Sequence, residues 1–152
     1  MTITDKLKQF LEAKGIAFEV TEHEAVYTSE QAAAVRGTTL ASGAKALILK
    51  AQEAYLMVVL AADRKLDSKK LKGHLACRSL RFASREEVDQ LTGLQPGSIP
   101  PFGSLFGLIT KVDRSLTEQS IINFNAADHR ISISMTFQDY LIAEKPEIVE
   151  CT

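Results

Sequence analysis

The fold is decided by the stretch KALILKAQEAYLMVVL, residues 45–60. It holds two apolar runs, residues 45–50 and 55–60, on either side of a short polar turn near Gln52 and Glu53. Two runs of strand length joined in this way predict a β-hairpin. The second run is apolar almost throughout, which is typical of a strand that is buried on both faces. We therefore expect the hairpin to lie in the middle of a sheet.

Outward from the hairpin, capping residues and apolar spacing predict five helices and several further strands. The expected helices begin at Thr2–Asp5, Thr28, Asp67, Ser84 and Thr136, and they end at Gly15, Gly37, Lys72, Gly93 and before Pro146. The further strands are expected at residues 16–20, 79–82, 105–112, 121–125 and 130–135. Because the strands cluster as hairpins instead of alternating with helices, the predicted fold class is α+β. The length of 152 residues fits one domain, residues 1–152.

Composition and charge argue against several classes of protein. The net charge of −1 gives no global basic field for nucleic acid, although a local basic patch is compatible with it. No apolar run is long enough to span a membrane and the first residues do not begin a signal peptide, so we expect a cytoplasmic protein that does not bind membranes. Cys77 and Cys151 lie far apart, which argues against a disulfide framework and against a cysteine-based zinc site. His23, His74 and His129 are too scattered to predict a metal site, and we expect no cofactor.

A second informative stretch is QPGSIPPFG, residues 95–103, which holds three of the four prolines and two of the eight glycines. Proline fixes its own φ and restricts the residue before it, whereas glycine lets a ligand approach the main chain closely. A stiff loop with bare N–H groups suits a site that stabilises a developing negative charge. The same composition is also typical of a plain turn between two elements.

Lys45 is the first candidate for chemistry, because it lies where a glycine-containing loop becomes an apolar strand. A lysine at this point can present a fixed positive charge to a phosphate or a carbonyl oxygen. The alternative is a lysine whose stem follows the sheet while its ammonium group reaches water. The residues around Lys45 do not form a Walker A motif.

Two further groups of residues are candidates for binding. Asn125 and His129 flank a loop between two expected strands, where they either serve the turn or line a cleft. A basic cluster that includes Lys65, Lys69 and Lys70 is the place where RNA phosphates would bind, if the protein binds RNA. Such a cluster is also typical of the solvated face of a short helix.

Taken together and in order, these stretches resemble the YbaK/prolyl-tRNA-synthetase-associated editing domain family, and most closely its YeaK-type branch. The resembling segments cover nearly the whole chain and are residues 23–26, 36–47, 61–63, 87–93, 97–102, 124–126 and 139–141. The resemblance implies a mixed, barrel-like sheet with helices packed around it. It also implies an aminoacyl-tRNA deacylase that acts in trans on esters of small amino acids, namely serine and threonine and also alanine.

The resemblance matches the family's lysine to Lys45 and its Gly-x-x-x-Pro loop to residues 97–101. It implies that the backbone N–H groups of Gly97 and Ser98 face the developing oxyanion and that Lys45 anchors a phosphate or other polar atoms of the substrate. The expected substrate contacts are Thr38, Ser42, Pro101, Asn125 and His129, and the expected tRNA contacts are Lys65, Lys69 and Lys70.

The partners expected from this resemblance are the acceptor end of an aminoacyl-tRNA and an aminoacyl-tRNA synthetase, for a protein that acts as a monomer. The alternative is a non-catalytic module of the same fold that binds aminoacyl-tRNA or nucleic acid. That alternative stays open because the sequence contains no recognisable nucleophile or metal site.

Overall fold

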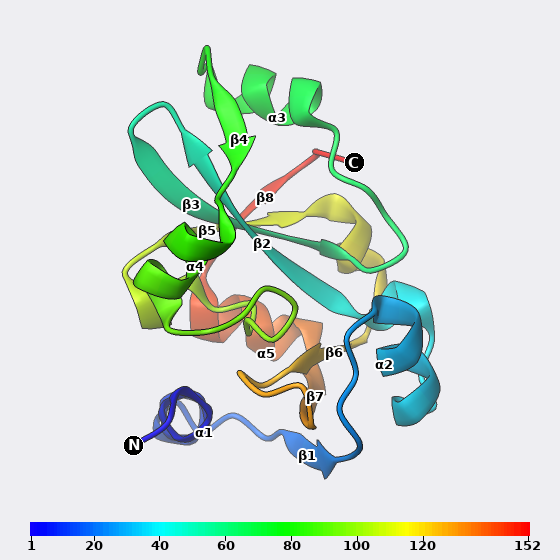
Figure 1. Ribbon diagram of the computed structural model, residues 1–152. Coiled ribbons are helices and arrows are strands. Elements are labelled where there is room, and N and C mark those ends of the chain that lie inside the picture. The colour runs from blue at the N-terminus through cyan, green and yellow to red at the C-terminus, as the bar shows by residue number, and fades with distance from the viewer.

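The computed structural model describes residues 1–152 (Figure 1). The α-helices are α1 Ile3–Ala13, α2 Ser29–Arg36, α3 Ser68–Leu75, α4 Arg85–Thr92 and α5 Phe137–Glu144. The strands are β1 Glu19–Glu22, β2 Ala44–Ala51, β3 Ala54–Ala61, β4 Leu80–Phe82, β5 Ile109–Asp113, β6 Ile121–Asn125, β7 Ile131–Thr136 and β8 Glu147–Val149. Short 3-10 helices lie at Leu40–Ser42, Gly103–Phe106 and Arg114–Glu118. Helices and strands do not alternate regularly, which confirms the α+β class, and no helix has the length and apolar character needed to cross a bilayer.

The strands form two sheets. Five strands in the order β4-β2-β3-β5-β8 form one sheet, and β1-β7-β6 form the other. The predicted hairpin is confirmed as the antiparallel pair β2 and β3, and β5 adds parallel to β3 on its other side. The sheets are joined by a parallel bridge between Gly43 and Asn123 and do not close into a barrel.

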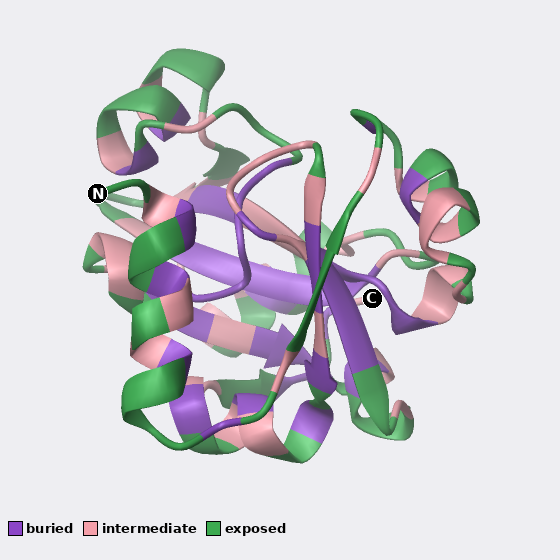
Figure 2. Cartoon of the chain, turned by 90° about the horizontal axis from the view of Figure 1, so that it is seen from below, coloured by how far each residue is buried: buried purple, intermediate pink, exposed green.

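Strand β3 is buried on both faces, because its side chains alternate between two hydrophobic clusters. Alternate residues from Met57 to Ala61 belong to the larger cluster, which lies between the two sheets. Alternate residues from Leu56 to Leu60 belong to the smaller cluster, which includes Leu71 of α3. Figure 2 shows the central strands in the colour of buried residues, with exposed residues mainly on the outer helices and loops. The prediction from the apolar run 55–60 is therefore confirmed.

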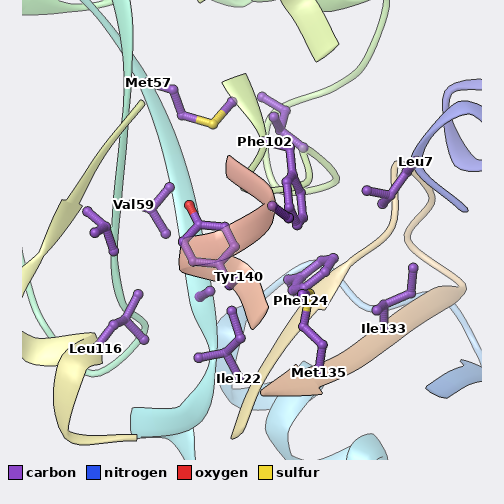
Figure 3. Packing of buried hydrophobic residues seen from close by; sticks show 14 of the residues in the cluster. Leu7, Met57, Val59, Phe102, Leu116, Ile122, Phe124, Ile133, Met135 and Tyr140 are labelled. Carbon is purple, nitrogen blue, oxygen red and sulfur yellow. The ribbon is translucent and has the colours of Figure 1, made fainter. Parts of the chain in front are cut away.

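The larger cluster is centred on aromatic rings (Figure 3). The ring centroid of Phe102 lies 5.8 Å from that of Phe10, 5.5 Å from that of Phe124 and 5.2 Å from that of Tyr140, always in an edge-to-face arrangement. The Tyr140 hydroxyl also donates a hydrogen bond of 2.7 Å to the Pro101 carbonyl. These contacts attach the proline and glycine loop to α1, β6 and α5.

Two predicted strands begin three to four residues later in the structure than the sequence pattern indicated. The strand predicted at residues 16–20 forms at Glu19–Glu22, because Ile16 packs into the core as the chain leaves α1. The strand predicted at residues 105–112 begins only after Gly107, whose left-handed φ of 70° ends a 3-10 helix. The residues on both sides of this turn are apolar, so the sequence pattern resembled one continuous strand.

Removal of the Phe102 ring should destabilise the fold strongly. Phe102 is 0% exposed, so Phe102→Ala leaves a cavity among the aromatic rings and should lower the free energy of unfolding by about 3–5 kcal/mol. Urea denaturation followed by circular dichroism measures this loss. Phe82→Ala is the control, because Phe82 is 55% exposed on strand β4. Equal losses in the two variants would contradict the central role of Phe102.

Candidate functional site

A cavity of about 190 Å³ lies where the two sheets meet. Its wall is formed by α2, the 3-10 helix at Leu40–Ser42, the start of β2, the end of β6 and the loop at Gly97. The bridge that joins the sheets lies in this wall, since Gly43 and Asn123 both line the cavity. Small side chains form much of the remaining wall, namely Ala32, Ala33, Ala44, Ala46 and Ala62.

Arg36, the last residue of α2, brings a guanidinium group to the cavity wall without a carboxylate partner. Its Nε donates to Ser132 Oγ at 2.8 Å, and its Nη2 donates to Asn125 Oδ1 at 2.9 Å. It takes part in none of the ion pairs of the structure. Burial lowers the pKa of Arg36 to about 10, which is still high enough to keep the group charged at neutral pH.

Asn125 connects Arg36 to the proline and glycine loop. Its Oδ1 accepts the hydrogen bond from Arg36, and its Nδ2 donates to the Gly97 carbonyl at 2.7 Å. Gly97 has a φ of 92°, a conformation that favours glycine. The Gly97 N–H donates to no acceptor within the protein. Gly97 lines the cavity and is exposed, so this residue of the wall keeps a backbone donor that no group of the protein uses.

Lys45 lines the same cavity from the start of β2. Its Nζ donates to the Arg64 carbonyl at 3.3 Å, in the segment that leads from β3 to α3. Like Arg36, Lys45 forms no ion pair, and no Asp or Glu lines the cavity. Two cations without opposing carboxylates give the cavity a positive potential, which favours an anion or an atom that becomes negative during a reaction.

Ser132 and His23 form a hydrogen-bonded pair that orients the Arg36 guanidinium. Ser132 Oγ, which accepts from Arg36 Nε, lies 2.7 Å from His23 Nε2. His23 Nδ1 lies 2.7 Å from the Glu24 carbonyl, and a carbonyl only accepts, so Nδ1 carries a proton. In the neutral form of His23, Nε2 therefore accepts from the Ser132 hydroxyl, which leaves Ser132 Oγ free to accept from Arg36.

Two predicted site residues serve the loop and not the cavity. Ser98 donates to the Gln95 carbonyl twice, from its N–H at 3.2 Å and from its hydroxyl at 2.9 Å. The N–H that we predicted to face an oxyanion is thus already used to close a turn, and Ser98 does not line the cavity. Pro101 does not line it either, and its carbonyl accepts from Tyr140. We therefore reassign Ser98 and Pro101 to the group that fixes the loop in place.

Thr38 and Ser42, two predicted substrate contacts, also lie behind the wall. Thr38 Oγ1 is buried without a partner, and it is the next residue, Thr39, that lines the cavity. Ser42 is 7% exposed, donates to the Thr39 carbonyl and accepts from Asn123, which does line the cavity. Ser42 therefore supports a cavity residue instead of forming the surface itself.

His129 lies beside an open groove that adjoins the cavity. Tyr27 lines both spaces, and the centroids of the Tyr27 and His129 rings are 4.6 Å apart. His129 Nδ1 donates to the Val26 carbonyl at 3.0 Å, whereas its Nε2 is buried without a partner. The structure thus places His129 next to the cavity and not in its wall.

The predicted tRNA contacts lie outside the cavity and are exposed. Lys69 and Lys70 belong to α3, and Lys65 lies in the segment before it. Lys70 Nζ donates to the Thr152 carbonyl at 2.8 Å. The segment that carries Lys65 is the one whose Arg64 carbonyl accepts from Lys45, so the basic cluster begins at the cavity.

Sequence reasoning missed Arg36 and Asn123 as site residues. Arg36 stands directly before Gly37, which looked only like a helix end. Asn123 stands between Ile122 and Phe124, both of which pack in the core. The period-2 alternation of a strand places Asn123 on the opposite face from them, and this pattern is the signal that could have found it.

The donor set favours binding of oxygen atoms over binding of a metal. No three His, Cys, Asp or Glu side chains converge anywhere in the structure. The polar groups at the wall instead include two cations, the two carboxamides of Asn123 and Asn125, and Gly97, whose backbone N–H has no partner in the protein. Hydroxyl groups complete the set, from Tyr27, Thr28, Ser29 and Thr39. This arrangement can bind an ester or phosphate and stabilise negative charge on its oxygen.

Comparison with known proteins gives matches over most of the chain. The model of the aminoacyl-tRNA editing domain matches residues 23–142. The Multifunctional Ser/Thr-tRNA deacylase ProXp-y of Escherichia coli is 37% identical over 149 residues, which are 95% of this chain and 89% of that protein. The Prolyl-tRNA editing protein ProX of Acetoanaerobium sticklandii is 28% identical over 131 residues, which are 82% of this chain and 79% of that protein.

The fold is also similar to solved structures. The crystal structure of a proposed trans-editing enzyme for prolyl tRNA synthetase superposes with a TM-score of 0.89 at 22% identity. The similarity covers 100% of this chain and 98% of that one. It supports the mixed α+β architecture described above.

The cavity should bind inorganic phosphate through its two unpaired cations. A ligand that binds only the folded state raises stability by RT ln(1 + [L]/Kd), which is about 1.4 kcal/mol at a tenfold excess over Kd. Thermal unfolding at increasing phosphate concentration measures the effect. We expect it to be much smaller in Arg36→Gln and Lys45→Gln, while Lys6→Gln, on the exposed surface of α1, keeps the full gain. The same gain in all three variants would mean that phosphate does not bind in the cavity.

Proposed function

Because this chain belongs to the aminoacyl-tRNA editing domain family, we propose that it hydrolyses, in trans, the ester bond of mischarged tRNA that carries a small amino acid. The substrates are seryl and threonyl esters, with alanyl esters as a further candidate. The observation that carries the proposal is the small cavity lined by Arg36, Lys45 and Gly97, whose backbone N–H has no partner in the protein. A protein nucleophile is not needed for this reaction, because an aminoacyl ester is already activated.

In the proposed reaction, a water molecule attacks the ester carbonyl carbon and the carbonyl oxygen becomes negative. The Gly97 N–H donates to this oxygen, and one such donor typically contributes ~3 kcal/mol to transition-state stabilisation. The bond between the carbonyl carbon and the ribose oxygen then breaks, and a proton that comes from the water ends on the ribose oxygen. The neighbouring ribose hydroxyl helps to position and activate the water.

The two cations have separate roles in this proposal. Lys45, whose Nζ donates to the Arg64 carbonyl, anchors the phosphate or other polar atoms of the terminal nucleotide. Arg36 holds Asn125, which in turn holds the carbonyl of Gly97, so Arg36 keeps the oxyanion donor in position. The positive charge of Arg36 also favours the developing oxyanion.

The wall of the cavity accounts for the selection of small amino acids. Five alanines make part of the cavity wall apolar. The cavity volume of about 190 Å³ leaves room for only a small part of the substrate, such as the aminoacyl group of a small amino acid. Bulky side chains are rejected because the surrounding core is packed and resists expansion. His129 and Tyr27, beside the adjoining groove, are placed to contact the nucleotide that carries the ester.

The tRNA approaches along the basic cluster. Its acceptor end enters past Arg64, and its phosphates contact Lys65, Lys69 and Lys70. The chain acts as one editing domain, residues 1–152, in monomeric form in the cytoplasm, where the tRNA released by an aminoacyl-tRNA synthetase is available to it.

A deacylation time course tests the proposed reaction. Wild type should release serine or threonine from mischarged tRNA and leave correctly charged prolyl-tRNA intact. Lys45→Ala should lower kcat/KM by about tenfold or more, which corresponds to ~1.4 kcal/mol of lost transition-state stabilisation. Lys50→Ala is the matched control, because Lys50 lies on the same strand outside the cavity, with its Nζ over the Tyr55 ring. Saturable binding of aminoacyl-tRNA with every ester intact would instead support a non-catalytic binding module.

The salt dependence of tRNA binding tests the basic cluster. Replacement of Lys65, Lys69 and Lys70 by glutamine should raise KM more than it lowers kcat, and should reduce the slope of log K against log salt by about 2–3. A triple replacement of Lys6, Lys8 and Lys14 is the control, because α1 lies at the opposite end of the molecule from α3 (Figure 1). An unchanged slope in the first variant would place the tRNA on another surface.

A further inference from the structure

Asn123 is a deeply buried carboxamide that faces the cavity. In β6, Ile122 and Phe124 pack in the core between the sheets, so the pleat turns Asn123 and Asn125 to the opposite face. Both asparagines line the cavity. Asn123 is only 7% exposed, which makes any unsatisfied polar atom on it costly.

The orientation of the Asn123 carboxamide is fixed by Ser42. The Ser42 hydroxyl has one proton, and it donates this proton to the Thr39 carbonyl at 2.8 Å. Ser42 Oγ can therefore only accept from Asn123, and it does so from Nδ2 at 3.0 Å. A flipped carboxamide would set Oδ1 against an oxygen that has no proton left to give. The two hydrogen bonds that link Thr39, Ser42 and Asn123 thus determine which end of the Asn123 carboxamide remains free.

The free end is Oδ1, an acceptor. It accepts no hydrogen bond from any group of the protein. Thr38 Oγ1 and His129 Nε2 are the side-chain atoms that are fully buried without a partner, so Asn123 Oδ1 still contacts open space. Since Asn123 lines the cavity, an unpaired acceptor is held at the cavity surface by a rigid strand.

We propose that Asn123 Oδ1 accepts the side-chain hydroxyl of the substrate amino acid and so selects seryl and threonyl esters over alanyl esters. This inference rests on the proposed function, because it names the specificity-determining residue of the same site. A serine or threonine hydroxyl satisfies the acceptor, whereas an alanine methyl leaves it buried and unpaired. A site built around such a hydrogen bond discriminates far more sharply than an apolar pocket does.

The second carboxamide and the two cations of the wall are unsuited to this role. Both ends of the Asn125 carboxamide are used, by Arg36 and by the Gly97 carbonyl. Arg36 and Lys45 only donate, and their charges serve oxygen atoms that carry or develop negative charge. The hydroxyl groups of Tyr27, Thr28, Ser29 and Thr39 also line the cavity, but none of these residues is buried, and water can satisfy their oxygens. Asn123 is thus the buried polar side chain of the wall, and it offers both a free acceptor and a fixed direction.

The experiment compares seryl and alanyl substrates on the same tRNA, in wild type and Asn123→Ala. We expect the ratio of kcat/KM for seryl over alanyl ester to fall by about tenfold to a hundredfold in the variant. The alanyl rate should be retained, because the groups around the ester are unchanged. Gln90→Ala, which removes an exposed carboxamide on α4, should leave the ratio as it is in wild type.

Ser42→Ala is the second variant, and it leaves β6 itself unaltered. Loss of the Ser42 hydroxyl frees the Asn123 carboxamide to rotate, so the seryl-to-alanyl ratio should fall in the same direction but less. Ser42 is a positioning residue in this proposal, and circular dichroism establishes that both variants are folded. A wild-type ratio in folded Ser42→Ala and Asn123→Ala would overturn the proposal. A proportional loss of both rates would also overturn it, because Oδ1 would then bind the α-ammonium group common to all amino acids.

A binding measurement separates this inference from the proposed function. Non-hydrolysable amide analogues of seryl- and alanyl-adenosine are titrated into each variant by calorimetry. Preferential binding of the seryl analogue by wild type, lost in Asn123→Ala, supports the inference even if no ester is hydrolysed and the proposed function fails. Hydrolysis of esters with no preference between the two analogues overturns the inference and leaves the function intact. Binding of neither analogue, without hydrolysis, overturns both.

Discussion

The packing of Phe102 between the two sheets is the constraint on which the cavity depends. Its ring touches Phe124 of β6 in the core, and the next residue of β6, Asn125, holds the Gly97 carbonyl in the cavity wall. The proline and glycine loop is thus attached to the same strand at two points, one apolar and one polar. Ser98 also closes a turn on Gln95, through hydrogen bonds from both its N–H and its hydroxyl. The available N–H of Gly97 is therefore positioned by the core and not by a flexible side chain.

Arg36 shows that the site carries a cost in stability. A half-buried guanidinium without a carboxylate loses hydration, which neutral hydrogen bonds to Ser132 and Asn125 offset only in part. The lowered pKa expresses the same desolvation. Native proteins retain such groups where a local cost in stability serves function. The absence of a nearby carboxylate keeps the positive charge available for a ligand.

The sequence predicted what depends on neighbours along the chain, and it missed what depends on distant contacts. The hairpin 45–60 and the helix end at Gly37 follow from local apolar pattern and glycine chemistry, and both are found in the structure. Lys45 could be named because it stands at a loop-to-strand boundary. Strand alternation alone places Asn123 on the face opposite to the core, but the orientation of its carboxamide depends on Ser42, 81 positions away. The turn at Ser98 is local, because its N–H donates to the Gln95 carbonyl, and the proline and glycine composition of residues 95–103 already favoured a turn there.

The bridge between Gly43 and Asn123 has a consequence for how such proteins diverge. It joins the two sheets and is also part of the cavity wall, so the width of the cavity follows from how the sheets pack. A Cβ at Gly43 would lie 3.1 Å from Ala62 Cβ, which leaves little slack at this junction. Changes in core residues behind the wall can therefore alter which amino acid fits, while every group around the ester stays the same. Substrate choice can in this way change through packing in the core, at a distance from the groups that surround the ester.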